Sequence, residues 1–247
     1  MNMRTSNAII MRIKEFGESD LLVTFFTQEK GQLKGVAKGA RRSRKRFVNC
    51  LDIFCLVDLE YGSRKKGDLY FLHSGKLINA FPGLRSDFTT LSRASYMIEL
   101  TEILFPYGVT EREIFHLLRD SFDAMAKGER VDIVPIIFEI RAMALGGYGI
   151  NLEKCCMCGR SYRGEGNAVY KPEKGGIACL KCQQISAVSP KLRADSVMIM
   201  KMMQSGPLTA LKELSVPDEI LAEFKPVLKL HREYHLGQRL KTAHYLD

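Results

Sequence analysis

Four of the seven cysteines form two pairs with a spacing typical of a metal site. Cys155 pairs with Cys158 and Cys179 pairs with Cys182, so the pattern reads Cys-x2-Cys-x20-Cys-x2-Cys. The two-residue gap lets both thiolates of a pair face one ion, and two pairs complete a tetrahedron of sulfur ligands. The segment between the pairs has few apolar residues, and a zinc ion contributes on the order of 10 kcal/mol or more to such a segment. We therefore predict one zinc ion per chain, which is structural because four protein ligands leave no open position.

Two other interpretations of these cysteines stay open at this point. A Cys-x-x-Cys pair is also typical of thioredoxin-like redox sites, although no βαβ pattern surrounds these pairs, and the thiols can also be unliganded. Cys156 could replace Cys155 as a ligand, but it leaves a gap of only one residue before Cys158. Cys50 and Cys55 lie in a strand-like stretch and are predicted to be small buried hydrophobic residues. An odd number of cysteines with two such pairs suits a reducing compartment, so we expect a cytoplasmic protein.

A second chemical feature is a run of cations in the first part of the chain. Thirteen residues, from Lys34 to Arg46, include seven basic side chains and no acidic one. Arginine suits phosphate because its planar guanidinium bonds two oxygens at once. We predict that this run binds DNA; the alternatives are a solvated loop and a contact with an acidic membrane or protein. The predicted DNA-binding residues are Lys34, Lys38, Arg41, Arg42, Arg44, Lys45 and Arg46.

The charge of the whole chain is concentrated in the same region. The formal net charge is +9, and residues 1–80 carry 15 Lys and Arg against 8 Asp and Glu, or +7, whereas the rest carry 22 against 20, or +2. This asymmetry indicates that the first third of the chain faces a polyanion, and Arg64, Lys65 and Lys66 add to it. No stretch approaches the ~18 consecutive apolar residues of a membrane-spanning helix. Residues 1–15 lack the small-residue cleavage site of a signal peptide.

The elements that must position the cations are predicted to be strands. Residues 1–80 contain five short runs rich in β-branched and aromatic residues, separated by glycines. Five strands in this length predict a small closed barrel, most often an oligonucleotide-binding (OB) fold, with an SH3-like barrel or a split sandwich as alternatives. The predicted strands are Asn7–Ile13, Leu21–Thr27, Gln32–Ala37, Asp52–Tyr61 and Asp68–Ile78. Aromatic residues here either pack in the barrel core, which we expect of each, or stack on bases. They are Phe25, Phe26, Phe47, Tyr61, Tyr70 and Phe71.

After Pro82 the apolar residues recur at helical spacing, which predicts an α+β protein of several domains. A first helix is capped by Ser86 or Asp87, and a second begins at Thr110 with a Thr-x-x-Glu capping box. A third helix follows Asp132 and ends at a glycine pair, and helical spacing returns from Ser189 and from Pro217. The predicted domains are the OB-fold barrel (1–80), the first part of a helical domain (81–150), an inserted zinc module (151–188) and the rest of the helical domain (189–247).

No catalytic motif accompanies these features. The chain has neither a phosphate-binding Gly-x4-Gly-Lys-Ser/Thr sequence nor a Gly-x-Ser-x-Gly sequence. His231 and His235 flank a glutamate as in metalloprotease helices, but the glutamate is one place away from both the forward and the inverted motif. We expect these histidines to pack along the last helix, and the methionines of residues 198–203 to be helix core. We therefore predict a protein that is not an enzyme.

Several segments resemble the RecO family of bacterial recombination-repair proteins. The N-terminal part of the resemblance is Gly17-Glu18-Ser19-Asp20-Leu21, then Thr27-x-x-x-Gly31, then Val36-Ala37-Lys38-Gly39-Ala40-Arg41-Arg42. Within it, the Gly-Glu-Ser-Asp and Ala-Lys-Gly-Ala-Arg segments are the specific part. The cysteine pairs, Ser189-Pro190, Leu240-Lys241-Thr242 and Tyr245-Leu246 are similar to the same family, so the resemblance covers essentially the whole chain. Some family members lack the cysteines, and the third thiol, Cys156, departs from the usual pattern.

The resemblance implies an OB-fold barrel, a helical domain and an inserted zinc module without catalytic activity. It implies binding of single- and double-stranded DNA, annealing of complementary strands, and loading of the recombinase onto strands coated by single-strand-binding protein. The implied partners are RecR, and RecF and single-strand-binding protein in the same pathway. A rival interpretation is a zinc-ribbon interaction module of the transcription machinery, and another is a nucleic-acid-modifying enzyme without a recognisable motif.

Overall fold

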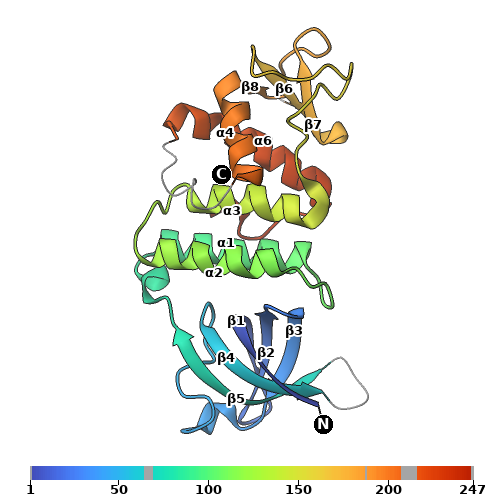
Figure 1. Cartoon of the computed structure of the whole chain (residues 1–247). Helices are drawn as coiled ribbons and strands as arrows, with labels where there is room; N and C mark the ends of the chain where they lie inside the picture. Colours follow the sequence, from blue (N-terminus) through green and yellow to red (C-terminus); the bar gives the residue numbers. More distant parts are fainter. Residues whose placement is uncertain (1, 64–68, 187, 207–215, 246–247) are drawn as a thin grey trace. The chain divides into compact units, whose positions relative to one another are not determined.

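The structure is a computed structural model that describes residues 2–63, 69–186, 188–206 and 216–245 (Figure 1). The chain divides into two compact units, Met1–Phe138 and Glu139–Asp247. The first unit contains a barrel followed by helices, and the second contains helices and a small sheet, so the predicted α+β class is confirmed. The finer division into four domains stays a prediction.

The first unit begins with a closed five-stranded barrel, and it confirms the predicted OB fold. Neighbouring strands follow the order β1-β2-β3-β5-β4, with β4 paired back to β1. All pairs are antiparallel except β3 with β5, which is parallel. The strands are β1 (Asn2–Phe16), β2 (Asp20–Thr27), β3 (Gly31–Ala37), β4 (Leu56–Ser63) and β5 (Tyr70–Asn79).

The barrel core is built by side chains that alternate along the strands, as a pleated strand buried on one face requires. Phe25 on β2 and Tyr61 on β4 meet edge to face, with ring centroids 5.6 Å apart. Four of the six aromatic residues considered for base stacking are buried, and core packing is therefore their role. These four are Phe25, Phe26, Phe47 and Tyr61.

One predicted strand begins too early. The apolar run from Asp52 was predicted to be strand, but β4 starts at Leu56, and the preceding residues form a turn in which Phe54 adopts a φ of 71°. The Phe54 ring packs edge to face on Phe122 of the helical region, 5.5 Å between centroids, so this apolar residue serves a helix and not the barrel. The predicted start of the fifth strand, Asp68, lies outside the described residues, and β5 begins at Tyr70.

Two helices of the first unit pack beside the barrel: α1 (Phe88–Leu104) and α2 (Arg112–Ala126) (Figure 1). Asp87 caps α1 as predicted, because its carboxylate accepts a hydrogen bond of 2.8 Å from the Thr90 amide. The predicted capping box at Thr110 is wrong. The α2 helix begins at Arg112, and the Glu111 carboxylate accepts from the Glu113 amide at 3.1 Å.

The turn between β2 and β3 explains why that cap lies elsewhere. Gly31 adopts a φ of +64°, and a Cβ at this position would overlap the carbonyl oxygen of Val109. Only glycine allows both the positive φ and this close approach. Residues 109–110 are thus held against the barrel and do not start the helix. A second contact joins the barrel to the helices: the Arg12 Nε of β1 donates to both oxygens of the Glu102 carboxylate of α1, at 2.7 Å each.

The second unit places a three-stranded antiparallel sheet, in the order β7-β6-β8, beside helices (Figure 1). The helix predicted from Ser189 begins only at Ala194, because residues 191–192 pair with β6 first. A buried ion pair of 2.9 Å joins Arg232 to Glu139. The elements are α3 (Val134–Met143), which starts in the first unit, η3 (Ala144–Tyr148), β6 (Ala168–Lys171), β7 (Gly176–Cys179), β8 (Lys191–Leu192), α4 (Ala194–Ser205) and α6 (Asp218–Leu236).

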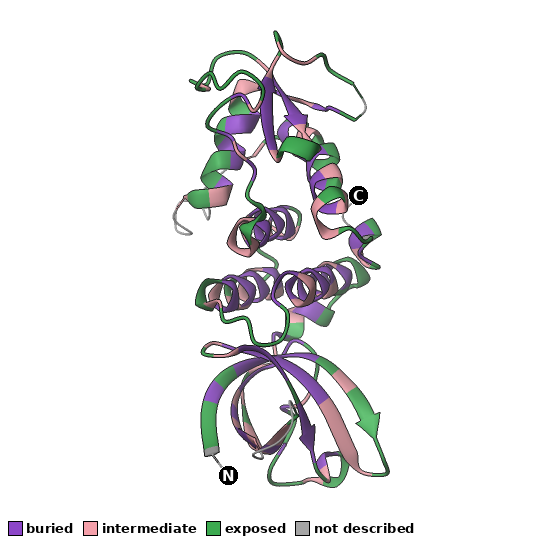
Figure 2. Ribbon diagram, turned by 90° about the vertical axis from the view of Figure 1, so that its right-hand side faces the viewer, coloured by how far each residue is buried: buried purple, intermediate pink, exposed green. Residues whose placement is uncertain are grey.

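Buried residues alternate with exposed ones along α4 and α6, whereas α3 is buried along most of its length (Figure 2). The last helix, α6, carries a polar residue among its buried ones. His231 of α6 is 2% exposed, so its place in the packing stripe is confirmed. Its Nε2–H donates to the Tyr148 carbonyl at 2.6 Å, since a carbonyl can only accept, and its Nδ1 accepts from the Tyr170 hydroxyl at 2.6 Å. His231 therefore ties two points of the chain to α6: Tyr148, which precedes the cysteine-bearing segment, and Tyr170 of β6, which lies between the two cysteine pairs. The predicted core role of the methionines holds only in part, because Met200 and Met203 are buried while Met198 is 58% exposed.

We expect acid to loosen this attachment. Burial lowers the pKa of His231 to about 4, below the ~6.5 of an unfolded histidine, and the hydrogen bond to Tyr148 opposes this only in part. The unfolded chain then binds more protons between these two values, so stability is full above pH ~6.5 and falls by roughly 2–3 kcal/mol toward pH ~4. Thermal melts of wild type and His231→Gln across this range measure the effect. A wild-type slope that persists in the variant would assign the loss to other groups, such as the thiols.

Candidate nucleic-acid interface and metal centre

The predicted DNA-binding side chains lie on β3 and on the connection that follows it. Lys34 is on β3, and the other six lie in residues 38–46, which we call the basic loop. The loop contains a single turn of 3-10 helix, η1 (Ala40–Arg42). All seven side chains are exposed, so a phosphate can reach each of them.

The turn between β1 and β2 holds the start of the basic loop. The Asp20 carboxylate accepts a hydrogen bond of 2.8 Å from the Gly39 amide, and the Arg41 amide donates to the Ser19 carbonyl at 3.0 Å. Gly39 has a φ of 63°, a conformation that glycine adopts without strain. The turn at residues 17–20 and the start of the basic loop thus hold one another in place. Ser19 and Asp20 are therefore positioning residues, and their side-chain types alone did not predict this role.

The end of the loop is anchored in the barrel. Phe47 and Cys50 are buried in the barrel core, and the Gly75 amide of β5 donates to the Arg46 carbonyl at 2.8 Å. The Arg46 guanidinium donates to the Lys38 carbonyl at 2.6 Å and lies 5.3 Å from the Phe47 ring centroid. Arg46 therefore holds the loop closed and has fewer donors left for phosphate.

The remaining cations are only weakly engaged. Arg41 forms an exposed ion pair of 3.1 Å with Glu15, and Lys38 Nζ lies 5.8 Å from the Phe71 ring centroid. Exposed pairs of this kind contribute at most about 1 kcal/mol, so a phosphate can displace Glu15. Of the seven predicted DNA-binding side chains, four have neither an ion pair nor an aromatic contact with a described residue: Lys34, Arg42, Arg44 and Lys45. The further cations predicted to help, residues 64–66, lie outside the described residues.

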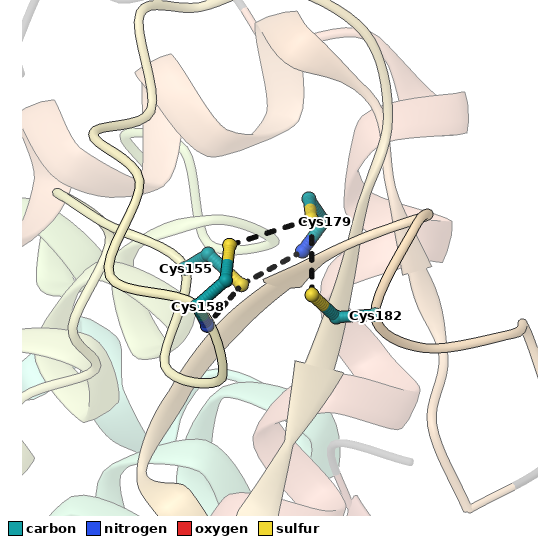
Figure 3. Close-up of side chains that lie close together, drawn as sticks. All are labelled: Cys155, Cys158, Cys179 and Cys182. Atoms are coloured by element: carbon teal, nitrogen blue, oxygen red, sulfur yellow. Dashed lines mark hydrogen bonds between the residues drawn. The ribbon is translucent and has the colours of Figure 1, made fainter.

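The four paired cysteines come together in the second unit (Figure 3). Their Sγ atoms all lie within 4.8 Å of one another, with 4.0 Å between Cys158 and Cys179 and 3.5 Å between Cys179 and Cys182. Zn–S bonds of ~2.3 Å in a tetrahedron place sulfur atoms roughly 3.8 Å apart. This cluster of four thiols therefore fits a metal ion with little rearrangement. Cys156 is not part of it, and its amide donates to the Ile177 carbonyl at 2.8 Å.

The local backbone favours thiolates at this cluster. Burial opposes ionisation of Cys155, but amide hydrogen bonds outweigh it and lower its pKa to about 6; those from Cys158 and Cys179 measure 3.5 and 3.3 Å. Hydrogen bonds from neighbouring thiols, Cys179 first, raise the pKa of Cys182 to about 12. Four close thiols cannot all ionise alone, and a bound cation removes that obstacle.

The two cysteines outside the cluster behave as small hydrophobic residues. Cys50 and Cys55 are buried in the barrel core, as predicted, although the stretch between them is not a strand. Burial raises the pKa of the Cys50 thiol to about 11, which leaves it protonated and unreactive at neutral pH.

Comparison with known proteins gives a consistent result over both units. The family model "Recombination protein O N terminal" matches residues 1–81, and "Recombination protein O C terminal" matches residues 85–244. The DNA repair protein RecO of Desulfatibacillum aliphaticivorans is 34% identical over 247 residues, which cover 98% of this chain and 95% of that protein. The DNA repair protein RecO of Syntrophus aciditrophicus is 31% identical over 253 residues, covering 100% and 97%. None of the described helices is long and apolar enough to cross a membrane.

Proposed function

This chain belongs to the RecO family of DNA repair and recombination proteins, and from that premise we propose that it acts as a recombination mediator. In this role it binds single- and double-stranded DNA and anneals complementary strands. With RecR, it assists loading of the recombinase onto strands coated by single-strand-binding protein, and RecF acts in the same pathway. The protein works without catalysis, in the cytoplasm and close to the nucleoid.

The exposed, anchored basic loop is the observation that carries this proposal. Annealing needs a surface that neutralises phosphates on two strands without reading the bases, since base edges must stay free to pair. Exposed arginines and lysines supply such attraction through release of counterions, whatever the sequence. Lys38 and Arg41 are the residues we expect to contribute most, because the hydrogen bonds of Ser19 and Asp20 fix their backbone.

We also propose that the four-thiol cluster binds one zinc ion. Cys155, Cys158, Cys179 and Cys182 are its ligands, and their soft sulfur donors suit zinc. The ion supplies folding free energy to its segment and no chemistry, because four thiolates leave no position for water or substrate.

Strand annealing without nucleotide or other cofactor tests the proposed function. Two complementary oligonucleotides, each labelled with one dye of a fluorescence-transfer pair, are mixed with the wild-type protein at low salt. We expect annealing well above the spontaneous rate, and recovery of chemically unchanged DNA. Binding without acceleration would favour an interaction module, and a covalent change in the DNA would show an enzyme; either result contradicts the mediator role.

A further inference from the structure

An open groove of about 800 Å³ lies next to the basic loop, within the first unit. Its walls come from Leu21 of β2 and from two segments, residues 40–55 and residues 80–85. Arg85 joins the two segments by donating to the Ile53 carbonyl. This volume falls within the ~300–1,000 Å³ of small-molecule sites, so the groove can hold a group the size of a nucleobase.

Apolar side chains form part of the groove lining. Phe47 belongs to the buried barrel core, whereas Leu51 is half-buried and Val48 is 50% exposed. Pro82 adds an exposed apolar surface from the opposite segment. Apolar surface beside a dense group of cations is unusual for a loop that only needs solubility, and it marks a place where an apolar group of a polyanion can be covered.

The charged residues at the groove favour an anionic ligand. Asp52 is the only acid among the lining residues, and its carboxylate pairs with Arg85 at 3.2 Å. The two other lining cations are Arg41, whose exposed pair with Glu15 can be displaced, and Arg44, which has no ion pair with a described residue. The groove thus combines apolar side chains with polar ones, such as Ser43 and Asn49, and has two guanidinium groups available to an anion.

We propose that this groove binds one unstacked base of single-stranded DNA, with the adjacent phosphates on Arg41 and Arg44. The inference rests on the proposed function and adds to it a source of single-strand preference. A paired base in a duplex is stacked on both faces and cannot enter, whereas a base of a single strand can turn into an apolar pocket at little cost. The phosphate contacts then bind both single-stranded and double-stranded DNA, whereas the groove binds only single-stranded DNA.

The test uses Val48→Glu, which places a charge at the groove wall without burying it. Met3→Glu is the matched control, because Met3 is also 50% exposed, lies in the same unit and does not line the groove. Binding is measured with a single strand of about 20 nucleotides, longer than the ~4–16 that one OB fold covers, and with the duplex of the same sequence. We expect Val48→Glu to weaken single-strand binding by about tenfold beyond the control, the size of one base contact, and to match the control on duplex.

A second readout reports on the base itself. A strand carrying 2-aminopurine, which brightens when it leaves the stack for an apolar site, is expected to gain fluorescence on the wild-type protein and not on Val48→Glu. Val48→Asn, which adds no charge, should reproduce the single-strand-specific loss to a smaller extent. Equal losses on single strand and duplex, or unchanged fluorescence, would overturn the inference. Wild-type annealing would still support the mediator role in that case, so the two failures are distinguishable.

Discussion

Replacing Cys179 with serine is expected to release the metal ion and to unfold the cysteine-bearing segment of the second unit. A serine hydroxyl is a poor zinc ligand, and zinc contributes on the order of 10 kcal/mol to small sites of this kind. The sheet β7-β6-β8 has strands of four, four and two residues, too short to persist without the ion. Elemental analysis should give about one zinc per chain for wild type and none for the variant. Hydrogen exchange should show lost protection in residues 151–186.

Cys156→Ser is the matched control, because Cys156 is adjacent to Cys155 but its thiol is not among the four clustered ones. This variant should keep its zinc and its melting temperature. Wild-type protein purified without metal, melting as the metal-loaded protein does, would refute the structural role. Metal loss in Cys156→Ser would show that the ligand set is wrong.

Short-range sequence patterns predicted most strands and helices correctly. The predicted starts of β4 and α2 were wrong because contacts with distant segments determine them. The strand alternation and the glycines between strands were sufficient to predict the barrel, and the two-residue gaps were sufficient to predict the cysteine cluster. The apolar residues near Phe54 look like strand, but they pack on a helix that comes much later in the chain. Thr110 has the sequence of a helix cap, but the neighbouring Val109 packs against Gly31 of the barrel, and the helix starts only at Arg112.

The DNA-binding candidates show the same limit. Their charge is visible in the sequence, but the support from Ser19 and Asp20 depends on a turn that lies before β2. The groove next to the loop has no sequence signature at all, since it forms between Leu21 and residues 40–55 and 80–85. Here the resemblance and the structure complement each other: the two segments that resemble the RecO family most specifically are those that hydrogen-bond to one another.

The central claim is that the basic loop binds phosphates and reads no bases, and the double variant Lys38→Ala/Arg41→Ala should show it. If about four to seven cations engage a single strand, log K falls with log[salt] with a slope of about −3 to −5, at roughly −0.7 per phosphate. Losing two contacts should flatten this slope by roughly 1.4 and weaken binding by about 25-fold at ~0.1 M salt. Folding should be unchanged, because exposed loop charges contribute little to stability.

The control removes the same charges elsewhere, in Arg112→Ala/Lys225→Ala, two exposed side chains on α2 and α6. The most direct measurement is therefore the salt dependence of binding to single strands of several base compositions, for wild type, the double variant and this control. We predict a flatter slope and the same loss on every sequence for the loop variant, and a wild-type slope for the control. An unchanged slope in Lys38→Ala/Arg41→Ala, or a loss that depends on base sequence, would contradict the account.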